Sequence, residues 1–414
     1  MKTFDWIIKG GRVIDPANDI DGVFDIAIAA GRIAVLGQAL DPGRAGQVYD
    51  ASGKLVVPGL IDLHAHVYNL VTPLGTDADY YCLGRGVTTA VDAGSAGCDT
   101  FPGFRAFAAA KARTRVLAFL NISRAGLSFA GPSGGDVPGE LESLKLIGRD
   151  DCIACIEANP DLLVGVKVRL SDTIADQGRN EAPAYRSARE AARATGLPLM
   201  VHHSFSTVPL EDCPGAMAGG DIYTHAYHGY PATIIDPKTR RVHAAVRAAQ
   251  ENGVLFDIGH GMGAFNWTVG EICAAESFWV DTIGTDMHSL TCEGPAYDMP
   301  TVMSRLLHLG MPLPELIRCS TINAAAAIGW EDRIGTLGVG READICVLEM
   351  EEVDMNLEDC HGQMRRIAQR LVPHAVWRAG APGRITRPRR WQDPEKIALA
   401  REWYARLVVS DAKL

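Results

Sequence analysis

Two histidines separated by one residue, His64 and His66, stand at the end of a long apolar run. Residues i and i+2 of a β-strand point to the same face, so both imidazoles can reach one ligand. Neutral imidazole is a common ligand of divalent metals. The pair alone fits two surface histidines at least as well, so a metal site needs partners from elsewhere in the chain.

Four other apolar runs carry residues of the same chemical kind near their ends: Lys167 in 164–171, His202 in 197–204, His225 in 221–228 and Asp286 in 281–288. Each histidine or acid alone could equally be a hydrogen-bonded core group. The lysine is unusual because burying an ammonium group is costly, although a lysine at a strand end can also extend its amine to solvent.

The elements that would position these residues are eight apolar runs separated by segments long enough for a helix, at 55–67, 87–94, 115–123, 164–171, 197–204, 221–228, 254–261 and 281–288. Near-continuous apolar runs that alternate with helical segments indicate buried parallel strands. Helices are predicted at 181–195, 239–252 and 321–327. The number and spacing of the runs predict an α/β fold, a (β/α)₈ TIM barrel over residues 55–330.

The two ends of the chain have a different rhythm, with short strand-like segments divided by Gly and Asp. They include 4–15 and 25–37 near the start and 334–337 and 343–348 after the last barrel helix. We predict that residues 1–54 and 331–385 together form one small β-sandwich domain. Residues 386–414 are predicted to be a helical tail.

In such a barrel the C-terminal strand ends meet at one mouth, where active sites lie. Five of the eight runs end in a possible metal ligand, which the 12 histidines in 414 residues would rarely produce by chance. Imidazole and carboxylate suit zinc, while manganese, iron, nickel and cobalt stay open. The sequence therefore predicts a metal-dependent enzyme.

Composition narrows the class further. The net charge is −10 and no basic run stands out, so we expect no nucleic-acid partner. No apolar stretch reaches membrane-spanning length and the N-terminus lacks a signal peptide, so we expect no membrane and a cytoplasmic location. The ten cysteines are then expected to be thiols, with the Cys152–Cys155 spacing read as one helical turn.

Three segments resemble a known family: the run 58–66 (PGLIDLHAH), the opening 7–15 (IIKGGRVID) and the return segment 335–345 (GTLGVGREADI) with 321–325 (TINAA). They are similar to the entry motif, first sandwich strands and return segment of the amidohydrolase superfamily. The resemblance covers nearly the whole chain. Lys167 on the fourth run is typical of its binuclear, dihydroorotase-like branch.

The resemblance implies two divalent metal ions, with zinc favoured. His64, His66 and Asp286 would hold one metal, His202 and His225 the other, and Lys167 would bridge both as a carbamate. A hydroxide between the metals would attack a carbonyl, with Asp286 as general base and acid. His202 is preferred to His203 because an apolar residue precedes the ligand in the family pattern.

Strand parity suggests further contacts with the substrate. Arg169 and Ser171 share the face of Lys167, and Arg169 could hold a carboxylate or pair with a loop acid. The remaining predicted pocket residues are Tyr68, Tyr227, His228, Asn266 and His288, with 265–267 as an aromatic wall and 125–140 as a lid or a plain loop.

Within the superfamily the chain most resembles deacetylases and esterases of acetylated hydroxy acids such as acetyl-mandelate, on residues 165–169, 221–225 and 284–288. We therefore predict hydrolysis of an acyl ester or amide of a small carboxylated molecule by a homo-oligomer. A cyclic amidase (dihydroorotase- or hydantoinase-like) and an N-acyl amino acid deacylase need the same ligands and stay open. A non-catalytic scaffold is the remote alternative, because such relatives lose ligands and this chain has all six.

Overall fold

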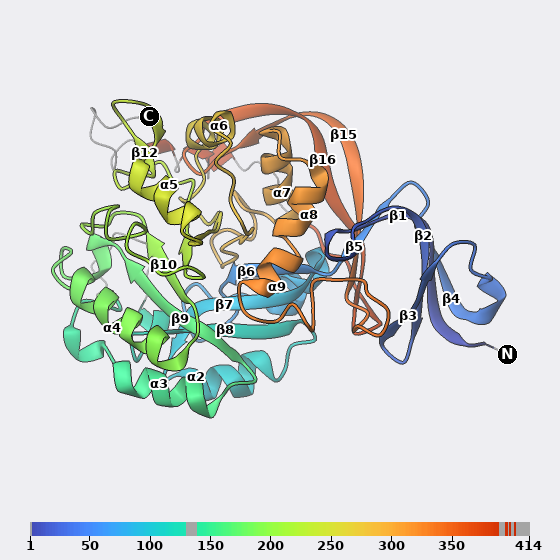
Figure 1. The fold of residues 1–414 in the computed structure, drawn as a ribbon, viewed down its shortest axis with the longest axis horizontal. Helices are drawn as coiled ribbons and strands as arrows, with labels where there is room; N and C mark the ends of the chain where they lie inside the picture. The colour runs from blue at the N-terminus through green and yellow to red at the C-terminus, as the bar shows by residue number, and fades with distance from the viewer. Residues whose placement is uncertain (1, 130–138, 389–393, 396, 399–400, 403–414) are drawn as a thin grey trace.

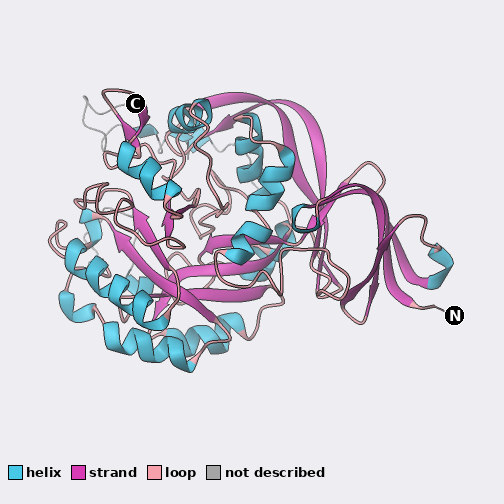
Figure 2. Cartoon of the chain, in the orientation of Figure 1, coloured by secondary structure: helices cyan, strands magenta, loops and turns pink. Residues whose placement is uncertain are grey.

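Two large β-sheets organise the chain in this computed structural model, which describes residues 2–129, 139–388, 394–395, 397–398 and 401–402. One sheet is parallel and belongs to the α/β body, and the other joins the two ends of the chain (Figures 1 and 2). In Figure 1 the terminal sheet extends to one side of the body.

The parallel sheet has seven strands, in the order β14 (Leu255–Phe256), β11 (Ile222–Thr224), β10 (Leu199–His203), β9 (Leu163–Leu170), β8 (Arg115–Asn121), β7 (Val87–Gly97) and β6 (Leu60–Ala65). All six strand pairings are parallel. Seven of the eight predicted runs therefore contribute a strand to one sheet.

The eighth run, 281–288, joins the sheet through isolated bridges rather than as a strand. Thr282 bridges Asp257 next to β14, and Met287 bridges Ala65 at the end of β6. Two backbone hydrogen bonds strengthen the second contact, because His66 N donates to Met287 O (2.8 Å) and Asp286 N donates to His64 O (2.6 Å). The curled sheet thus has both edges in contact with one segment, and its description as an eight-stranded barrel stays a prediction.

Successive apolar residues of a strand point to opposite faces of the sheet, and both faces are buried, as predicted. Val91, Ala93, Leu117 and Phe119 pack in one buried cluster with α9 (Ile322–Ala326). Val168 on β9 packs in a different, larger buried cluster, which contains residues of the surrounding helices. Side chains on the inner face near the strand ends therefore lie toward one common space.

Helices surround the sheet at α1 (Ala78–Tyr81), α2 (Phe101–Gly103), α3 (Arg149–Ala158), α4 (Glu181–Thr195), α5 (Ala244–Glu251), α6 (Trp267–Ala275), α7 (Met299–His308) and α8 (Leu313–Cys319). The predicted helix 181–195 is confirmed, and Gly196 ends it in the left-handed conformation (φ 67°). The predicted helix 239–252 begins later, at Ala244, because 241–242 pairs as β13 (Arg241–Val242) with β12 (Ile235–Asp236).

The terminal sheet has eight strands, in the order β17 (Ala381–Gly383), β16 (Met364–Arg378), β15 (Ile345–Glu358), β5 (Leu55–Pro58), β1 (Phe4–Asp15), β2 (Ile20–Ala29) and β3 (Arg32–Gly37), with β4 (Ala45–Asp50) also paired to β1. The two chain ends thus share one sheet, while its division into a sandwich stays a prediction. The first predicted barrel strand needs correction, since β5 pairs with β1 and β15 instead. The segment 334–337, which was predicted to be a strand, does not form one. The chain rejoins the terminal sheet only at Ile345, where β15 begins.

The β15–β16 hairpin is longer than the sequence indicates and arches over the α/β body (Figure 1). Its tip meets the loop after β14, where Cys360 N donates to Phe265 O (3.1 Å) and Trp267 N donates to an Asp359 carboxylate oxygen (3.0 Å). The C-terminal part of the chain therefore supports the loops at the strand ends.

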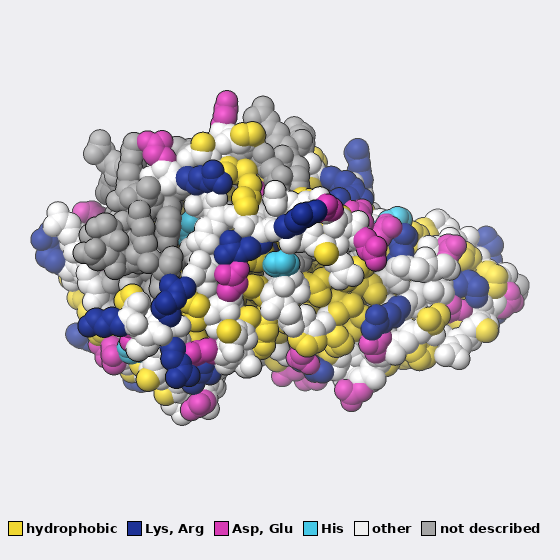
Figure 3. All heavy atoms as spheres, turned by 90° about the horizontal axis from the view of Figure 1, so that it is seen from above, with side chains coloured by type: hydrophobic (Ala, Val, Ile, Leu, Met, Phe, Trp, Pro, Cys, Tyr) yellow, Lys and Arg dark blue, Asp and Glu magenta, His cyan; other side chains and the backbone are white. Residues whose placement is uncertain are grey.

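Other expectations concern the surface, the cysteines and the predicted lid and tail. Figure 3 shows acidic and basic side chains interspersed on one face. In the described part of the chain no helix is long and apolar enough to span a membrane. All ten cysteines are free thiols, and Cys152 and Cys155 lie on α3, as predicted. Most of the predicted tail 386–414, and 130–138 of the predicted lid, lie outside the described residues.

Candidate metal centre

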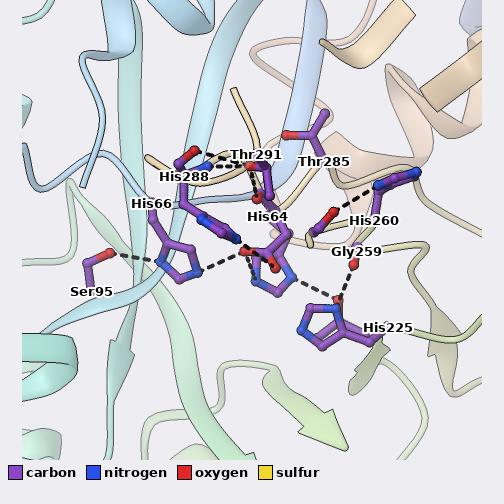
Figure 4. Close-up of polar contacts among 12 residues, drawn as sticks. His64, His66, Ser95, His225, Gly259, His260, Thr285, His288 and Thr291 are labelled. Atoms are coloured by element: carbon purple, nitrogen blue, oxygen red, sulfur yellow. Dashed lines mark hydrogen bonds and ion pairs between the residues drawn. The ribbon is translucent and has the colours of Figure 1, made fainter. Parts of the chain in front are cut away.

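His64 and His66 lie at the end of β6 (Figure 4), where the contact with the eighth run brings Asp286 next to them. The distances from Asp286 Oδ1 are 3.0 Å to His66 Nε2 and 3.5 Å to His64 Nε2. One ligand atom from each of the three residues lies within 4.8 Å of the others. The bridge between Ala65 and Met287 brings these side chains together, although more than 200 residues separate them in the sequence.

Buried hydrogen-bond partners determine that Nδ1 of the His64 ring carries the proton. Thr224 Oγ1 donates to Asp257 Oδ2 (2.7 Å) and lies 2.8 Å from His64 Nδ1. Since a hydroxyl has one proton, Thr224 can only accept from His64, so the proton is on Nδ1. Nε2 of His64 then has a free lone pair toward the common space.

His225 has the same arrangement with a backbone partner. Its Nδ1 lies 2.6 Å from Gly259 O, and a carbonyl can only accept, so Nδ1 carries the proton and Nε2 is unprotonated (Figure 4). The backbone of His225 has a φ of 68°, and that of Asp286 has a φ of 48°. Such left-handed conformations are uncommon outside glycine and gather at functional sites.

His202 completes the set of imidazoles. Its ring centroid lies 4.2 Å from that of His225, and the His225 centroid lies 4.9 Å from that of His64. His202 Nε2 shares a hydrogen bond with Ser204 Oγ (2.9 Å). The adjacent His203 points to the other side of β10, as alternation predicts, where its ring contacts Val208 O and the Tyr223 hydroxyl.

Lys167 lies on β9 with its side chain buried among these groups. Among the described residues none is hydrogen-bonded to Nζ, although Lys167 is only 1% exposed. Burial lowers the pKa of Lys167 to about 7, in spite of the nearby Asp286 carboxylate. Gly94 leaves room for the side chain, because a Cβ there would lie 2.7 Å from Lys167 Cγ.

The protonation of the other groups follows from burial and their neighbours. Burial holds the pKa of His64 and of His202 well below the usual range and lowers that of His225 to about 4. Burial alone would raise the pKa of Asp286, but His64 and the histidines beside it hold that pKa well below the ordinary value. Three neutral imidazoles and a carboxylate are thus the ionisation states that metal ligation requires.

The donor set fits a divalent metal ion, with a second pair of imidazoles close by. His64, His66 and Asp286 form one group of ligand atoms, and His202 and His225 form a second group beside it. Lys167 lines the same cavity, its Nζ has no hydrogen-bond partner in the described part of the chain, and its pKa of about 7 leaves about half the amine unprotonated near pH 7. A neutral amine is the form that can add carbon dioxide, which would turn the buried lysine into an oxygen ligand.

These candidate ligands open into one cavity, which Arg169, Ser171 and His288 also line. His288 Nε2 lies 4.0 Å from Asp286 Oδ2. Of the predicted substrate contacts, Arg169 and His288 therefore face the same space as the candidate ligands. The further lining residues are Leu74, Ser204, Phe205, Tyr230, Met262, Gly263, Ala264 and Leu290.

Four other predicted pocket residues are not among those that line this cavity. The Tyr68 hydroxyl donates to Thr100 O (2.9 Å), and the Tyr227 hydroxyl donates to Phe278 O (2.7 Å), so both rings are used in packing. Asn266 caps α6, since its Oδ1 accepts from Val269 N (3.1 Å). His228 is fully buried and stacks on Tyr230 from behind.

The aromatic wall also differs from the prediction. Phe265 and Trp267 are fully buried and pack on each other, with ring centroids 5.0 Å apart. Phe205 and Tyr230, whose centroids are 4.1 Å apart, line the cavity instead. Phe205 directly follows the fifth run and Tyr230 lies two residues after the sixth, so an aromatic search just beyond each strand end could have found them.

The parallel α/β fold and a buried cluster of two histidines and an acid that could hold a metal ion are typical of an enzyme. The chain matches the amidohydrolase family over residues 55–381, and it belongs to that family. It is 33% identical over 350 residues to a deacetylase of Agrobacterium fabrum (strain C58), covering 84% of each chain.

Two solved structures share the fold over nearly their whole length. One is described as an adenine deaminase, with a TM-score of 0.83 and 28% identity over 92% of this chain and 99% of that one. The other is described as a dihydroorotase, with the same TM-score and identity over 92% of this chain and 100% of that one. All of these relatives support a hydrolase that acts on small molecules.

Proposed function

We propose that this hydrolase cleaves an acyl ester or amide of a small carboxylated molecule, in the manner of a deacetylase. The observation that carries the proposal is the buried Lys167 amine, without a hydrogen-bond partner in the described part of the chain, amid the candidate metal ligands. The similarity to the Agrobacterium deacetylase supports the reaction class, and the guanidinium in the same cavity supports a carboxylated substrate.

We assign His64, His66 and Asp286 to one metal, His202 and His225 to the other, and Lys167, as a carbamate, to both. Zinc is favoured by the imidazole and carboxylate donors. When bound, such metals supply Lewis acidity toward a carbonyl oxygen and activate water near neutral pH. The remaining work is done by side chains of this chain.

Asp286 is the proton carrier in this proposal. Its pKa is held low by the surrounding histidines, so the side chain starts as a carboxylate that can accept a proton. Its Oδ1 faces His64 and His66, while Oδ2 lies nearer His288. Asp286 can therefore take a proton from water and deliver it to the leaving oxygen or nitrogen, the usual part of a general base and acid.

The rest of the cavity binds the substrate. Arg169 presents a planar set of N–H donors that matches a carboxylate. Phe205 and Tyr230 offer aromatic faces for an apolar substituent. The Tyr230 hydroxyl lies close to the backbone of Gly263, which narrows the cavity on the side of these two rings. These features favour a small acylated acid with an apolar group over a large polar substrate.

We also propose that the curled sheet closes into a barrel. The contacts of the 281–288 segment with both sheet edges support a closed (β/α)₈ barrel around the site. The fold and the ligands would serve a cyclic amidase equally well, and the dihydroorotase with a TM-score of 0.83 favours that reaction as the second candidate.

A substrate panel tests the reaction class on one zinc-loaded sample. It contains acetyl-mandelate, N-acetyl amino acids, hydantoin and dihydroorotate. We expect turnover of the acetyl ester or an acetyl amide and little turnover of the two rings. Hydrolysis of a ring with no acyl hydrolysis would replace the deacetylase proposal by the cyclic amidase.

A further inference from the structure

Glu140 is a fully buried acid that the candidate site does not yet explain. It is 0% exposed, and in the part of the chain that the structure describes neither carboxylate oxygen has a hydrogen-bond partner. Its charge partner is Arg169, whose Nη1 lies 3.3 Å from Glu140 Oε1. Burying a carboxylate is expensive, so this contact calls for a reason.

The backbone around Glu140 is held firmly against the loop after β9. Leu141 N donates to Ile174 O (3.1 Å), and Asn180 Nδ2 donates to Leu141 O (2.9 Å). Gly139 passes so close that a Cβ would lie 2.4 Å from the Ile174 Cα. These contacts hold the backbone on both sides of Glu140 against the loop after β9, with the Glu140 side chain directed at Arg169.

Arg169 is the member of the Glu140–Arg169 ion pair that lines the cavity. It lies on β9 two residues after Lys167, pairs in register with His202 on β10, and is 9% exposed. Its Nη1 is buried and has no hydrogen-bond partner among the described residues. With five N–H groups and one ion-pair contact, Arg169 keeps donors for a ligand in the cavity.

We propose that Glu140 is a positioning residue, which holds the Arg169 guanidinium so that its free N–H donors face a substrate carboxylate. The inference rests on the proposed function and deepens it, because it makes the anionic group a requirement for tight binding. An arginine without a fixed partner would have to be ordered by each ligand, which costs affinity.

A competing effect has the opposite sign. Glu140 partly neutralises Arg169, so its removal would strengthen a purely electrostatic attraction for an anion. Positioning and charge therefore predict opposite changes in affinity for a carboxylate, and the direction of the change decides between them.

The test is calorimetric binding of mandelate and of its neutral carboxamide to the full-length, zinc-loaded protein. We expect the wild type to bind mandelate about tenfold or more tighter than mandelamide. Glu140→Gln should weaken mandelate binding by about tenfold and change mandelamide binding by less than about twofold. In an Arg169→Met background, Glu140→Gln should have no further effect.

Two more variants separate positioning from folding and from charge. Glu140→Asp keeps the charge and shortens the side chain, so it should weaken mandelate binding in the same direction as Glu140→Gln. If Glu140→Gln does not fold, Glu140→Asp tests the inference in its place. Asp354→Asn removes the partner of Arg366 in an exposed ion pair and should leave binding unchanged.

Unchanged or tighter mandelate binding by Glu140→Gln or Glu140→Asp, or equal losses for mandelate and mandelamide, would overturn the inference. So would a wild type without preference for the carboxylate. Binding is measured without turnover, so a protein that hydrolyses no acyl substrate but shows the expected binding pattern would contradict the proposed function alone.

Discussion

Thr224→Val offers a direct way to test how the candidate metal centre is held. The Thr224 hydroxyl donates to the buried Asp257 and accepts from His64, which leaves the lone pair of His64 on Nε2. Valine has nearly the same shape and suits the strand β11, so the change removes the hydroxyl with little change in volume.

The size of the effect follows from the loss of this partner. Groups that orient a ligating histidine typically contribute about 10–100-fold to metal affinity, or roughly 1.4–2.7 kcal/mol. The unpaired His64 N–H and Asp257 oxygen should also lower the free energy of unfolding by about 1–3 kcal/mol each. We expect one zinc ion to be lost to a chelator about 10–100-fold more readily than in the wild type.

Thr282→Val is the matched control. Thr282 Oγ1 donates to the other oxygen of the same acid, Asp257 Oδ1 (3.0 Å), and has no hydrogen bond to a candidate ligand. Urea unfolding should show a loss of stability in both variants, larger in Thr224→Val because two buried groups lose a partner there rather than one, and chelator competition should show a loss of zinc affinity only for Thr224→Val. Equal zinc affinities in the two variants would refute the reasoning.

Three further predictions concern individual groups of the site. Asp286→Asn should lower kcat by at least about 100-fold, measured on the best substrate, because the amide cannot carry the proton; a kcat within about tenfold of wild type would contradict this role. Gly94→Ala should destabilise the protein by more than about 1 kcal/mol in urea unfolding, because its φ is 86° and a Cβ would meet Lys167; wild-type stability would count against the close approach. In the metal-free protein Lys167 binds fewer protons folded than unfolded between its lowered pKa of about 7 and the ordinary value of 10.5, so stability should rise with pH in that window, by at most about 1.4 kcal/mol per pH unit. Lys167→Met should lack this rise relative to the wild type, and parallel pH curves for the two proteins would refute it.

The parallel strands and the residues at their ends could be predicted because both signals are local. A β-branched run followed by His or Asp appears in the sequence whatever the rest of the chain does, and the curled parallel sheet then brings the run ends together. The structure brings His64, His66, His202, His225, Lys167 and Asp286 around one space.

The pocket walls could not be predicted in the same way. Tyr68 and Tyr227 have the right parity, but each hydroxyl finds a backbone carbonyl outside the cavity, and parity does not hold once a strand has ended. Glu140 comes from a loop distant in sequence from β9, so its contact with Arg169 depends on tertiary packing alone. The full length of the β15–β16 hairpin could not be predicted either, because the polar residues in its middle lack the apolar pattern of a buried strand.

The most direct test of the account is the number of metal ions per chain, measured by elemental analysis. After loading with zinc in the presence of bicarbonate, we predict about two zinc ions per wild-type chain and no more than one in Lys167→Ala, because the bridging ligand is lost. No more than one zinc in the wild type, or two in Lys167→Ala, would contradict the assignment of Lys167 to a binuclear centre.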